Sequence, residues 1–195
     1  MKKVFKFLSV GLIAGIMTGT FAGCGSAGGN TNKIGMVIST LDNPFFVNLK
    51  AGAEDKAKEL GYELIVVDSQ NDSSKELSNV EDLLQKGVSA LIINPVDSDA
   101  AKSSVIKANS EEVPVITVDR QANGGEVKTH IASDNIKGGE MAAEYIKEKL
   151  GGAGIIAELQ GTPGASATRD RGTGFHNIVD ADSNLNVVSS QPADF

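Results

Sequence analysis

Residues 39–46 of the chain read Ser-Thr-Leu-Asp-Asn-Pro-Phe-Phe. They follow an apolar run at residues 34–38, and apolar residues at helical spacing begin directly behind them, at Leu49. The sequence therefore predicts a buried strand that leads through a polar loop into a helix. In open α/β sheets, ligands bind in the crevice outside the carboxyl ends of such strands. We expect this loop to lie in a ligand-binding crevice.

Within this loop, Asn43, Pro44, Phe45 and Phe46 have complementary side chains. The Asn43 amide can both donate and accept hydrogen bonds, and proline suits the first position of a helix because it has no N–H to leave unpaired. Neighbouring residues of a helix lie about 100° apart, so one phenyl ring is expected in the core and the other in the crevice. Such a set suits a small ligand with polar edges and apolar faces. The alternative is that both rings belong to the core of the helix.

Composition and charge narrow the class of protein. The chain has 195 residues, of which 41% are hydrophobic and 22% charged. This composition is typical of a globular protein, with room for one full domain or for one domain and part of another. The formal net charge is -7, and residues 1–23 hold lysines but no acid, so the remainder is more acidic still. The negative net charge of these remaining residues argues against a nucleic acid as the partner.

The N-terminus is typical of an exported protein. Residues 1–23 combine a basic start, an apolar stretch and small residues, which is the pattern of a secretory signal peptide. The end of this stretch, Phe21-Ala22-Gly23-Cys24, resembles the lipobox of bacterial lipoproteins, in which the cysteine is lipidated and becomes the mature N-terminus. Cys24 is the only cysteine, so no disulfide can form within the chain. We expect lipidation at Cys24 and a flexible tether at residues 24–32. The alternative is an ordinary cleaved signal with an incidental thiol.

From Lys33 onward, short apolar segments alternate with helical patterns. Strands are predicted at residues 34–38, 62–68, 90–93, 115–118 and 127–133, with helices between the first four. The run from Ser73 to Glu76 fits a capping box for the second helix, and the third helix is expected from about Asp97 to Asn109. Helices between short apolar strands are typical of a doubly wound parallel α/β sheet. We place this N-terminal α/β domain at residues 33–133.

Polar residues follow three of these strands, at residues 39–46, Asn94-Pro95 and Asp119-Arg120. If the sheet is parallel, these strand ends lie along one edge and converge on one crevice. Asp119 accepts hydrogen bonds through two oxygens, and Arg120 donates through a planar guanidinium, so the pair can serve neighbouring sugar hydroxyls. The alternative is that the two side chains merely pair on the rim of the sheet or cap the next turn.

After Ser133 the alternation of helix and strand begins again. A helix is predicted from Asp134-Asn135, then a strand at residues 155–159, a helix at about 165–180 and a strand at 185–188. The first of these helices is expected to turn five residues inward: Met141, Ala142, Tyr145, Ile146 and Leu150. This pattern predicts the start of a second, similar α/β domain at residues 134–195.

Several short motifs occur in a fixed order along the chain. They are residues 39–46, Ile93-Asn94-Pro95, Val118-Asp119-Arg120, residues 130–135, 158–161, 169–172 and 190–195. In this order they resemble the bacterial D-ribose-binding proteins, members of the pentose/hexose family of periplasmic-type binding proteins of ABC importers. The likeness covers residues 33–195. It implies two doubly wound domains that are joined by a hinge and close over one sugar, with the first crossing between them near Ser133-Asp134.

The same resemblance assigns sugar contacts and partners. Carried over motif by motif, the contacts are Asn43, Phe45, Phe46, Asp119, Arg120, Arg171 and Phe195. The resemblance implies delivery of D-ribose or a similar monosaccharide to the membrane subunits of an ABC permease, with a chemoreceptor as a further partner. It implies no cofactor, no metal and a monomer when complete. The protein would be anchored by its lipid to the outer face of the cytoplasmic membrane, or be periplasmic.

The resemblance also implies a longer chain. Family members continue well beyond the motif that ends at Phe195 and supply the rest of the second domain, the return strands of the hinge and further ligand contacts. We therefore expect a truncated form whose second domain is incomplete. On its own this form is expected to bind sugar weakly or not at all.

Three other functions compete with this interpretation. An enzyme is disfavoured because the sequence has only two histidines, His130 and His176, which we expect to be structural or exposed, and no metal-binding cluster, G-x-S-x-G motif or phosphate-binding loop. A sugar-sensing regulator of the Lac repressor family would need a helix-turn-helix where the signal peptide stands. The third alternative, a binding protein for another monosaccharide or a furanose-like signal molecule, stays open.

Overall fold

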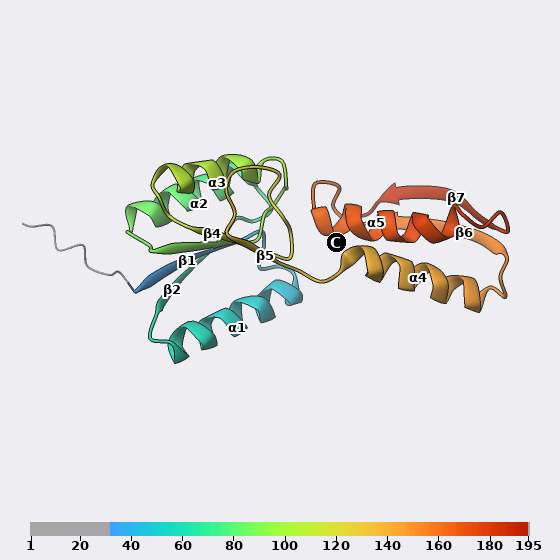
Figure 1. Ribbon diagram of the computed structural model, residues 1–195, viewed down its shortest axis with the longest axis horizontal. Helices are drawn as coiled ribbons and strands as arrows, with labels where there is room; N and C mark the ends of the chain where they lie inside the picture. The colour runs from blue at the N-terminus through green and yellow to red at the C-terminus, as the bar shows by residue number, and fades with distance from the viewer. Residues whose placement is uncertain (1–31, 195) are drawn as a thin grey trace, which may run out of the picture.

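The computed structural model describes residues 32–194, and these residues form two units (Figure 1). One unit is built around a five-stranded sheet and the other around a two-stranded sheet. We call them the N-terminal lobe, residues 32–131, and the C-terminal lobe, residues 135–194. The predicted signal peptide, Cys24 and all of the tether but Asn32 lie outside the described residues, as does Phe195. Between residues 32 and 194, no helix is both long and apolar enough to cross a membrane.

The sheet of the N-terminal lobe is parallel throughout, as predicted. Its strands are β1 (Lys33–Ile38), β2 (Glu63–Asp68), β3 (Ala90–Ile93), β4 (Val115–Val118) and β5 (Thr129–Ile131). Their order in space is β2-β1-β3-β4-β5, so the chain reverses its winding direction between β1 and β3. In doubly wound sheets, ligands bind at such a switch point. The end of β1, which leads into residues 39–46, therefore lies where a ligand is expected.

Helices cover both faces of this sheet (Figure 1). They are α1 (Pro44–Glu59) on one face, and α2 (Ser73–Gln85) and α3 (Ala101–Ser110) on the other. Side chains of a strand alternate between the faces, so β1 contributes to both cores. Met36 packs with Phe46 of α1, whereas Val37 packs with Leu83 of α2. The N-terminal lobe is thus buried on both sides of its sheet.

The capping box predicted at Ser73 to Glu76 is wrong. Helix α2 is capped by Asp72, whose Oδ1 accepts hydrogen bonds from the backbone N–H groups of Ser74 and Lys75 at 2.7 and 3.1 Å. Aspartate at the N-cap satisfies these donors, so the glutamate is not needed there. Glu76 instead points into the protein and is only 1% exposed.

Helix α3 begins at Ala101, later than predicted. The reason is Asp97, whose Oδ1 accepts hydrogen bonds from the N–H groups of Asp99 and Ala100 at 2.9 and 2.8 Å. Its carboxylate thereby stabilises a turn where the helix was expected to start. Strand β5 is likewise shorter than the predicted run at residues 127–133.

The C-terminal lobe repeats the alternation of helix and strand. Its elements are α4 (Asn135–Lys149), β6 (Gly154–Gln160), α5 (Ser166–Val179) and β7 (Leu185–Pro192). The two strands are parallel, and β7 continues beyond the predicted end at Val188. A small core joins Ala143 of α4, Ile156 of β6 and Phe175 of α5.

The predicted inward face of α4 is wrong. Met141, Ala142, Tyr145 and Leu150 are exposed, and of the five predicted residues only Ile146 packs against the core. Helix α4 instead turns Gly139 toward α5, where a Cβ atom on Gly139 would lie 2.0 Å from the carbonyl oxygen of Arg171. A Cβ atom on Gly174 of α5 would lie 1.9 Å from the carbonyl oxygen of Ile136. The helices pack backbone against backbone, and apolar spacing alone gave no sign of this contact.

One face of the β6–β7 sheet is left uncovered by the part of the chain that the structure describes. Ile155 and Leu159 of β6 are 72% and 78% exposed, and Val188 of β7 is 59% exposed. The two lobes therefore share a folding pattern but differ in how completely their sheets are buried.

Candidate ligand-binding site

Residues 39–46 form the loop between β1 and α1, and Asn43 fixes its end. The Asn43 Oδ1 atom accepts a hydrogen bond from the Phe45 N–H at 2.9 Å, so Asn43 caps α1 and Pro44 is the first helical residue, as predicted. The rings of Phe45 and Phe46 meet edge to face, with centroids 5.3 Å apart. Phe46 is 3% exposed and packs with Met36 and Ile38 in the core, whereas Phe45 is 54% exposed. One ring is therefore buried as predicted, but the buried ring also borders the cavities described below, so core and crevice are not divided between the two rings.

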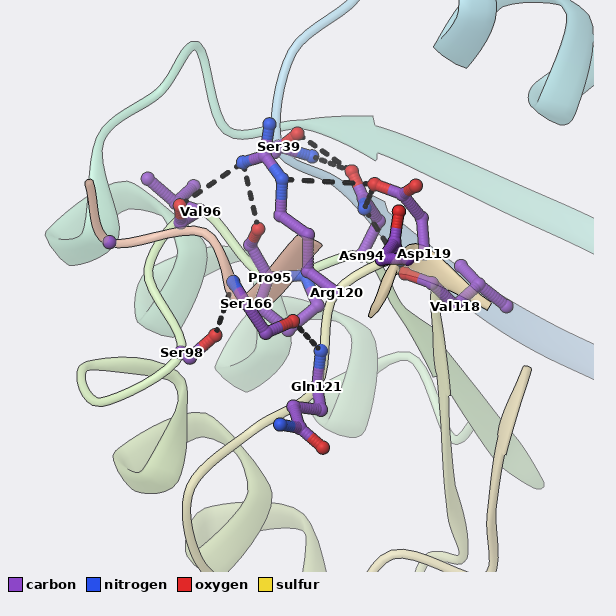
Figure 2. A network of polar contacts seen from close by, with 12 residues as sticks. Ser39, Asn94, Pro95, Val96, Ser98, Val118, Asp119, Arg120, Gln121 and Ser166 are labelled. Carbon is purple, nitrogen blue, oxygen red and sulfur yellow. Dashed lines mark hydrogen bonds and ion pairs between the residues drawn. The ribbon is translucent and has the colours of Figure 1, made fainter. Parts of the chain in front are cut away.

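Asn94, directly after β3, joins the carboxyl ends of three strands (Figure 2). Its Oδ1 atom accepts hydrogen bonds from the N–H and the hydroxyl of Ser39, at 3.2 and 2.6 Å. Its Nδ2 atom donates to the Val118 carbonyl at 3.1 Å and to Asp119 Oδ2 at 3.5 Å. Asn94 is completely buried. One side chain thus holds the ends of β1, β3 and β4 together at the same edge of the sheet.

Asp119 occupies a tight turn at the end of β4. Its φ angle is +62°, and the N–H of Arg120 donates to the Val118 carbonyl at 2.7 Å across it. Positive φ is uncommon outside glycine and is most often tolerated by asparagine and aspartate. The turn directs the Asp119 carboxylate toward Asn94. Burial raises the pKa of Asp119, and the nearby guanidinium groups of Arg120 and Arg171 oppose the rise.

Arg120 is only 3% exposed, and its guanidinium is held from several sides. The Nη1 atom donates to the carbonyls of Pro95 and Val96, both at 3.1 Å (Figure 2). The Nε atom lies 3.8 Å from Asp119 Oδ2, and the guanidinium carbon lies 5.3 Å from the centroid of the Phe46 ring, within cation–π range. Burial lowers the pKa of Arg120, and the charge of Asp119 opposes this. The charge remains, since arginine stays protonated in proteins.

Arg171, in the C-terminal lobe, lies near Asp119 and Arg120. It lies on α5, and its Nε atom donates to Oδ1 of Asn135, the first residue of α4, at 2.9 Å. Residues of both lobes line a cavity of 230 Å³ here: Asn43, Phe45, Phe46, Asp119, Arg120, Ser133, Asn135, Ala167 and Arg171. Six of the seven predicted sugar contacts therefore surround one cavity. The seventh, Phe195, lies outside the described residues.

A second cavity, of 320 Å³, adjoins the first. The two share Asn43, Phe46 and Arg120 as lining residues. Thr162 and Asp194 of the C-terminal lobe line the second cavity. The space around Arg120 is thus bounded by both lobes, and its walls are polar and aromatic.

Hydrogen bonds between loops join the lobes beside this space (Figure 2). The Ser98 N–H donates to the Gly164 carbonyl at 3.0 Å, and the Ser98 hydroxyl accepts from the Ser166 N–H at 3.2 Å. The Ser166 hydroxyl accepts from the Gln121 N–H at 2.9 Å. Sequence reasoning missed these serines because serine is common in loops and at the starts of helices, and no spacing distinguishes Ser98 in its loop or Ser166 at the start of α5.

The side chains of the site can recognise a polar ligand through hydrogen bonds. A carboxylate and two guanidinium groups offer acceptors and donors beside two phenyl rings. No group of three or more histidine, cysteine, aspartate or glutamate side chains within residues 32–194 could hold a metal ion. His130 hydrogen-bonds to Thr117, His176 hydrogen-bonds to Asp180, and neither histidine lines the two cavities.

Comparison with known proteins agrees with this geometry. The profile of a family described as "Periplasmic binding protein domain" matches residues 34–194. The ribose import binding protein of Bacillus subtilis (strain 168) is 60% identical over 162 residues, which are 83% of this chain and 52% of that protein. The ribose import binding protein of Escherichia coli (strain K12) is 55% identical, over 84% of this chain and 55% of that protein. The chain thus spans about half the length of these relatives.

Solved structures agree as well. The myo-inositol binding protein of Caulobacter, bound to myo-inositol, superposes with a TM-score of 0.80 at 29% identity, over 85% of this chain and 57% of that one. The periplasmic binding component of the arabinose ABC transporter of Shewanella sp. ANA-3, bound to L-arabinofuranose, gives a TM-score of 0.78 at 29% identity, over 83% and 55% of the two chains. This chain therefore belongs to the periplasmic binding protein family.

Proposed function

We propose that this chain is the solute-binding lipoprotein of an ABC sugar importer, and that it binds D-ribose between two hinged domains and delivers it to the permease. The observation that carries the proposal is the single cavity lined by six predicted sugar contacts from both lobes. The identity to ribose import binding proteins supports the choice of ribose. The proposed domains are residues 33–133 and 134–195, with the first crossing near Ser133-Asp134.

The proposed mechanism rests on burial of the sugar. The phenyl rings lie against its C–H faces, and Asp119, Arg120 and Arg171 satisfy its hydroxyls in a space that holds little water. A sugar that lacks one of these hydroxyls leaves a buried polar group unpaired, and this penalty is the source of specificity. Because the sugar touches both lobes only when they are closed, its binding favours the closed form, which docks on the permease. The sugar is released unchanged, so no catalytic step is involved.

The proposal includes export and a lipid anchor at Cys24. The lipobox-like residues before Cys24 support this, and the family contains exported periplasmic proteins. Expression of the chain and of Cys24→Ser in a bacterium fed labelled palmitate tests the anchor. Label in the parent chain and none in the variant is expected. Equal labelling of the two proteins would contradict the assignment.

Isothermal titration with ribose, arabinose, allose and myo-inositol tests the sugar. Two proteins are needed: the chain from Cys24 onward, and the same chain extended with the C-terminal half of the Bacillus subtilis relative. We expect the extended protein to bind ribose more tightly than the other sugars, and the chain alone to bind ribose weakly. No heat with ribose in the extended protein would overturn the proposal.

A second candidate is a binding protein for another monosaccharide or a furanose-like signal molecule. The Shewanella structure favours it, because its ligand is a furanose. The same titration separates the two, since tighter binding of arabinose or allose than of ribose would select this candidate.

A further inference from the structure

Glu76 is a buried carboxylate that does not line the proposed sugar site. It lies in the first turn of α2, is 1% exposed, and leaves the capping of that helix to Asp72. Charged side chains are almost never fully buried unless they are paired. Its position therefore requires a physical reason.

Both oxygens of Glu76 accept hydrogen bonds from the chain that follows β3. Oε2 accepts the Val96 N–H at 2.7 Å, and Oε1 accepts the Ser104 hydroxyl at 3.0 Å. Burial raises the pKa of Glu76, while these two hydrogen bonds and the charge of Arg120 oppose the rise. The carboxylate thus ties the loop after β3 to the start of α2.

The Val96 N–H belongs to the same peptide unit as the Pro95 carbonyl. In a trans peptide the N–H and C=O groups are coplanar and point in opposite directions, and no peptide bond of the described chain is cis. When Glu76 holds the N–H on one side, the Pro95 carbonyl must face the other side. Arg120 Nη1 lies there and donates to this carbonyl at 3.1 Å. Proline has no N–H of its own, so the Val96 N–H is the first backbone donor after Asn94 that can fix this peptide.

From this geometry we infer that Glu76 is a positioning residue of the ligand site: it orients the Pro95–Val96 peptide so that its carbonyl holds the guanidinium of Arg120 at the cavity. Its effect on sugar binding rests on the proposed function. Its effect on Arg120 does not, because the contacts exist without a sugar.

The mobility of the Arg120 side chain tests the inference directly. The sequence has only three arginines, so nitrogen-15 NMR resolves their guanidinium signals, and Arg120→Lys identifies the signal of Arg120. The measured quantity is the rate at which the Arg120 side-chain N–H groups exchange with water. Glu76→Leu removes the acceptor and should raise this rate about tenfold or more, since a hydrogen bond to a charged group is lost. Glu76→Gln keeps an oxygen acceptor for Val96 and should leave the rate within about twofold of the parent.

Two control variants separate positioning from general stability. Leu83→Ala, on the same helix, opens a cavity in the apolar core without touching the loop. Ser104→Ala removes the other hydrogen bond of Glu76. Neither should change the exchange of Arg120 in the folded protein. The inference is overturned if folded Glu76→Leu exchanges like the parent, or if Ser104→Ala frees Arg120 as strongly. If Glu76→Leu does not fold, Glu76→Met takes its place, since it keeps the length of the side chain without an oxygen acceptor. Exchange about tenfold faster than in the parent then supports the inference, and exchange like that of the parent overturns it.

Ribose affinity of the extended protein gives a second readout. Glu76→Leu should weaken binding about tenfold more than Leu83→Ala does, and Glu76→Gln should bind like the parent. Loss in Glu76→Gln as large as in Glu76→Leu would contradict a role through the Val96 hydrogen bond. If the parent itself does not bind ribose, the proposed function fails, while the exchange rates still decide the role of Glu76.

Discussion

The two lobes follow the same alternation of strand and helix, but they bury the side chains of their sheets to different degrees. Leu91, in β3 of the N-terminal lobe, is completely buried in the core between the sheet and helices α2 and α3, whereas Leu159 in β6 is 78% exposed. The arginines of the two lobes differ in the same way, since Arg120 is buried and Arg171 is exposed. The comparison teaches that a shared pattern need not give equal stability. The N-terminal lobe therefore contributes a buried arginine to the cavity, and the C-terminal lobe contributes an exposed arginine that hydrogen-bonds to Asn135.

Truncation of one strand leucine in each lobe should show the largest difference. Leu91→Ala creates a cavity in a closed core and should lower the free energy of unfolding by about 2–5 kcal/mol. Leu159→Ala removes an exposed side chain and should change it by about 0.5 kcal/mol or less. Urea denaturation monitored by circular dichroism measures both. Similar losses in the two variants would mean that β6 is covered as well as β3 in solution.

Removal of each arginine from the C-terminal lobe compares a site residue with a neighbour. Arg171→Ala should weaken ribose binding by the extended protein by about 1.5–3 kcal/mol, because a charge-assisted contact is lost. Arg169→Ala is the matched control, since Arg169 donates to the Gly164 carbonyl and does not line the 230 Å³ cavity. Calorimetric titration gives both values. Equal affinities of the Arg171 variant and the parent would remove Arg171 from the site.

Two glycines of α5 test how the C-terminal lobe is held together. Gly174→Ala places a Cβ atom 1.9 Å from the Ile136 carbonyl oxygen of α4, and should destabilise this lobe by about 1–3 kcal/mol through overpacking. Gly172→Ala meets nothing within 4 Å and should stabilise the helix by up to about 1 kcal/mol. Hydrogen exchange should show faster exchange in α4 and α5 of the Gly174 variant and no change in β1, β3 and β4. Uniform acceleration in both lobes would show that they unfold as one unit.

His176 should make the C-terminal lobe slightly sensitive to pH. Its Nδ1 pairs with Asp180 at 3.0 Å and its Nε2 pairs with Glu158 of β6 at 3.3 Å. The hydrogen bond to Asp180 raises the pKa of His176, and the bond to Glu158 adds to this against the effect of burial. A raised pKa means that the fold favours the protonated ring, so this stabilisation is complete below the ordinary pKa of histidine and is lost as pH rises through the raised one.

The variant His176→Gln makes this measurable. It should lower the free energy of unfolding of the C-terminal lobe by about 0.2–1 kcal/mol at about pH 5.5, as expected for a largely exposed ion pair, and by less at about pH 9. Urea denaturation at a series of pH values tests this. A loss that grows with pH would show that the neutral ring is the stabilising form.

Much of the N-terminal lobe could be predicted because its local signals agree with its packing. The strands β3 and β4 and the helix start at Pro44 were predicted at the residues where they occur. The convergence of Asn43, Asp119 and Arg120 followed from the parallel sheet alone. In this lobe, the residues that favour each strand or helix locally also have the apolar pattern that its packing requires.

The failures arose where a residue serves a distant partner. Glu76 fits a capping box by spacing, but its partners are Val96 and Ser104, which no local pattern reveals. The inward face of α4 was predicted from its apolar residues, whereas the contact with α5 is made by Gly139 and Gly174. Hydrophobic spacing identifies an amphipathic helix, but it does not say whether a sheet, a helix or solvent faces each side.

Groups from both lobes form one sugar site in this proposal, and a nitrogen-15 NMR titration of the extended protein with ribose is its sharpest test. Within residues 32–194, we expect ribose to cause saturable shifts of the backbone signals around Asn43, Phe46, Asp119 and Arg120 and, in the other lobe, around Arg171. Shifts that map elsewhere, or to the N-terminal lobe alone, would contradict the proposal.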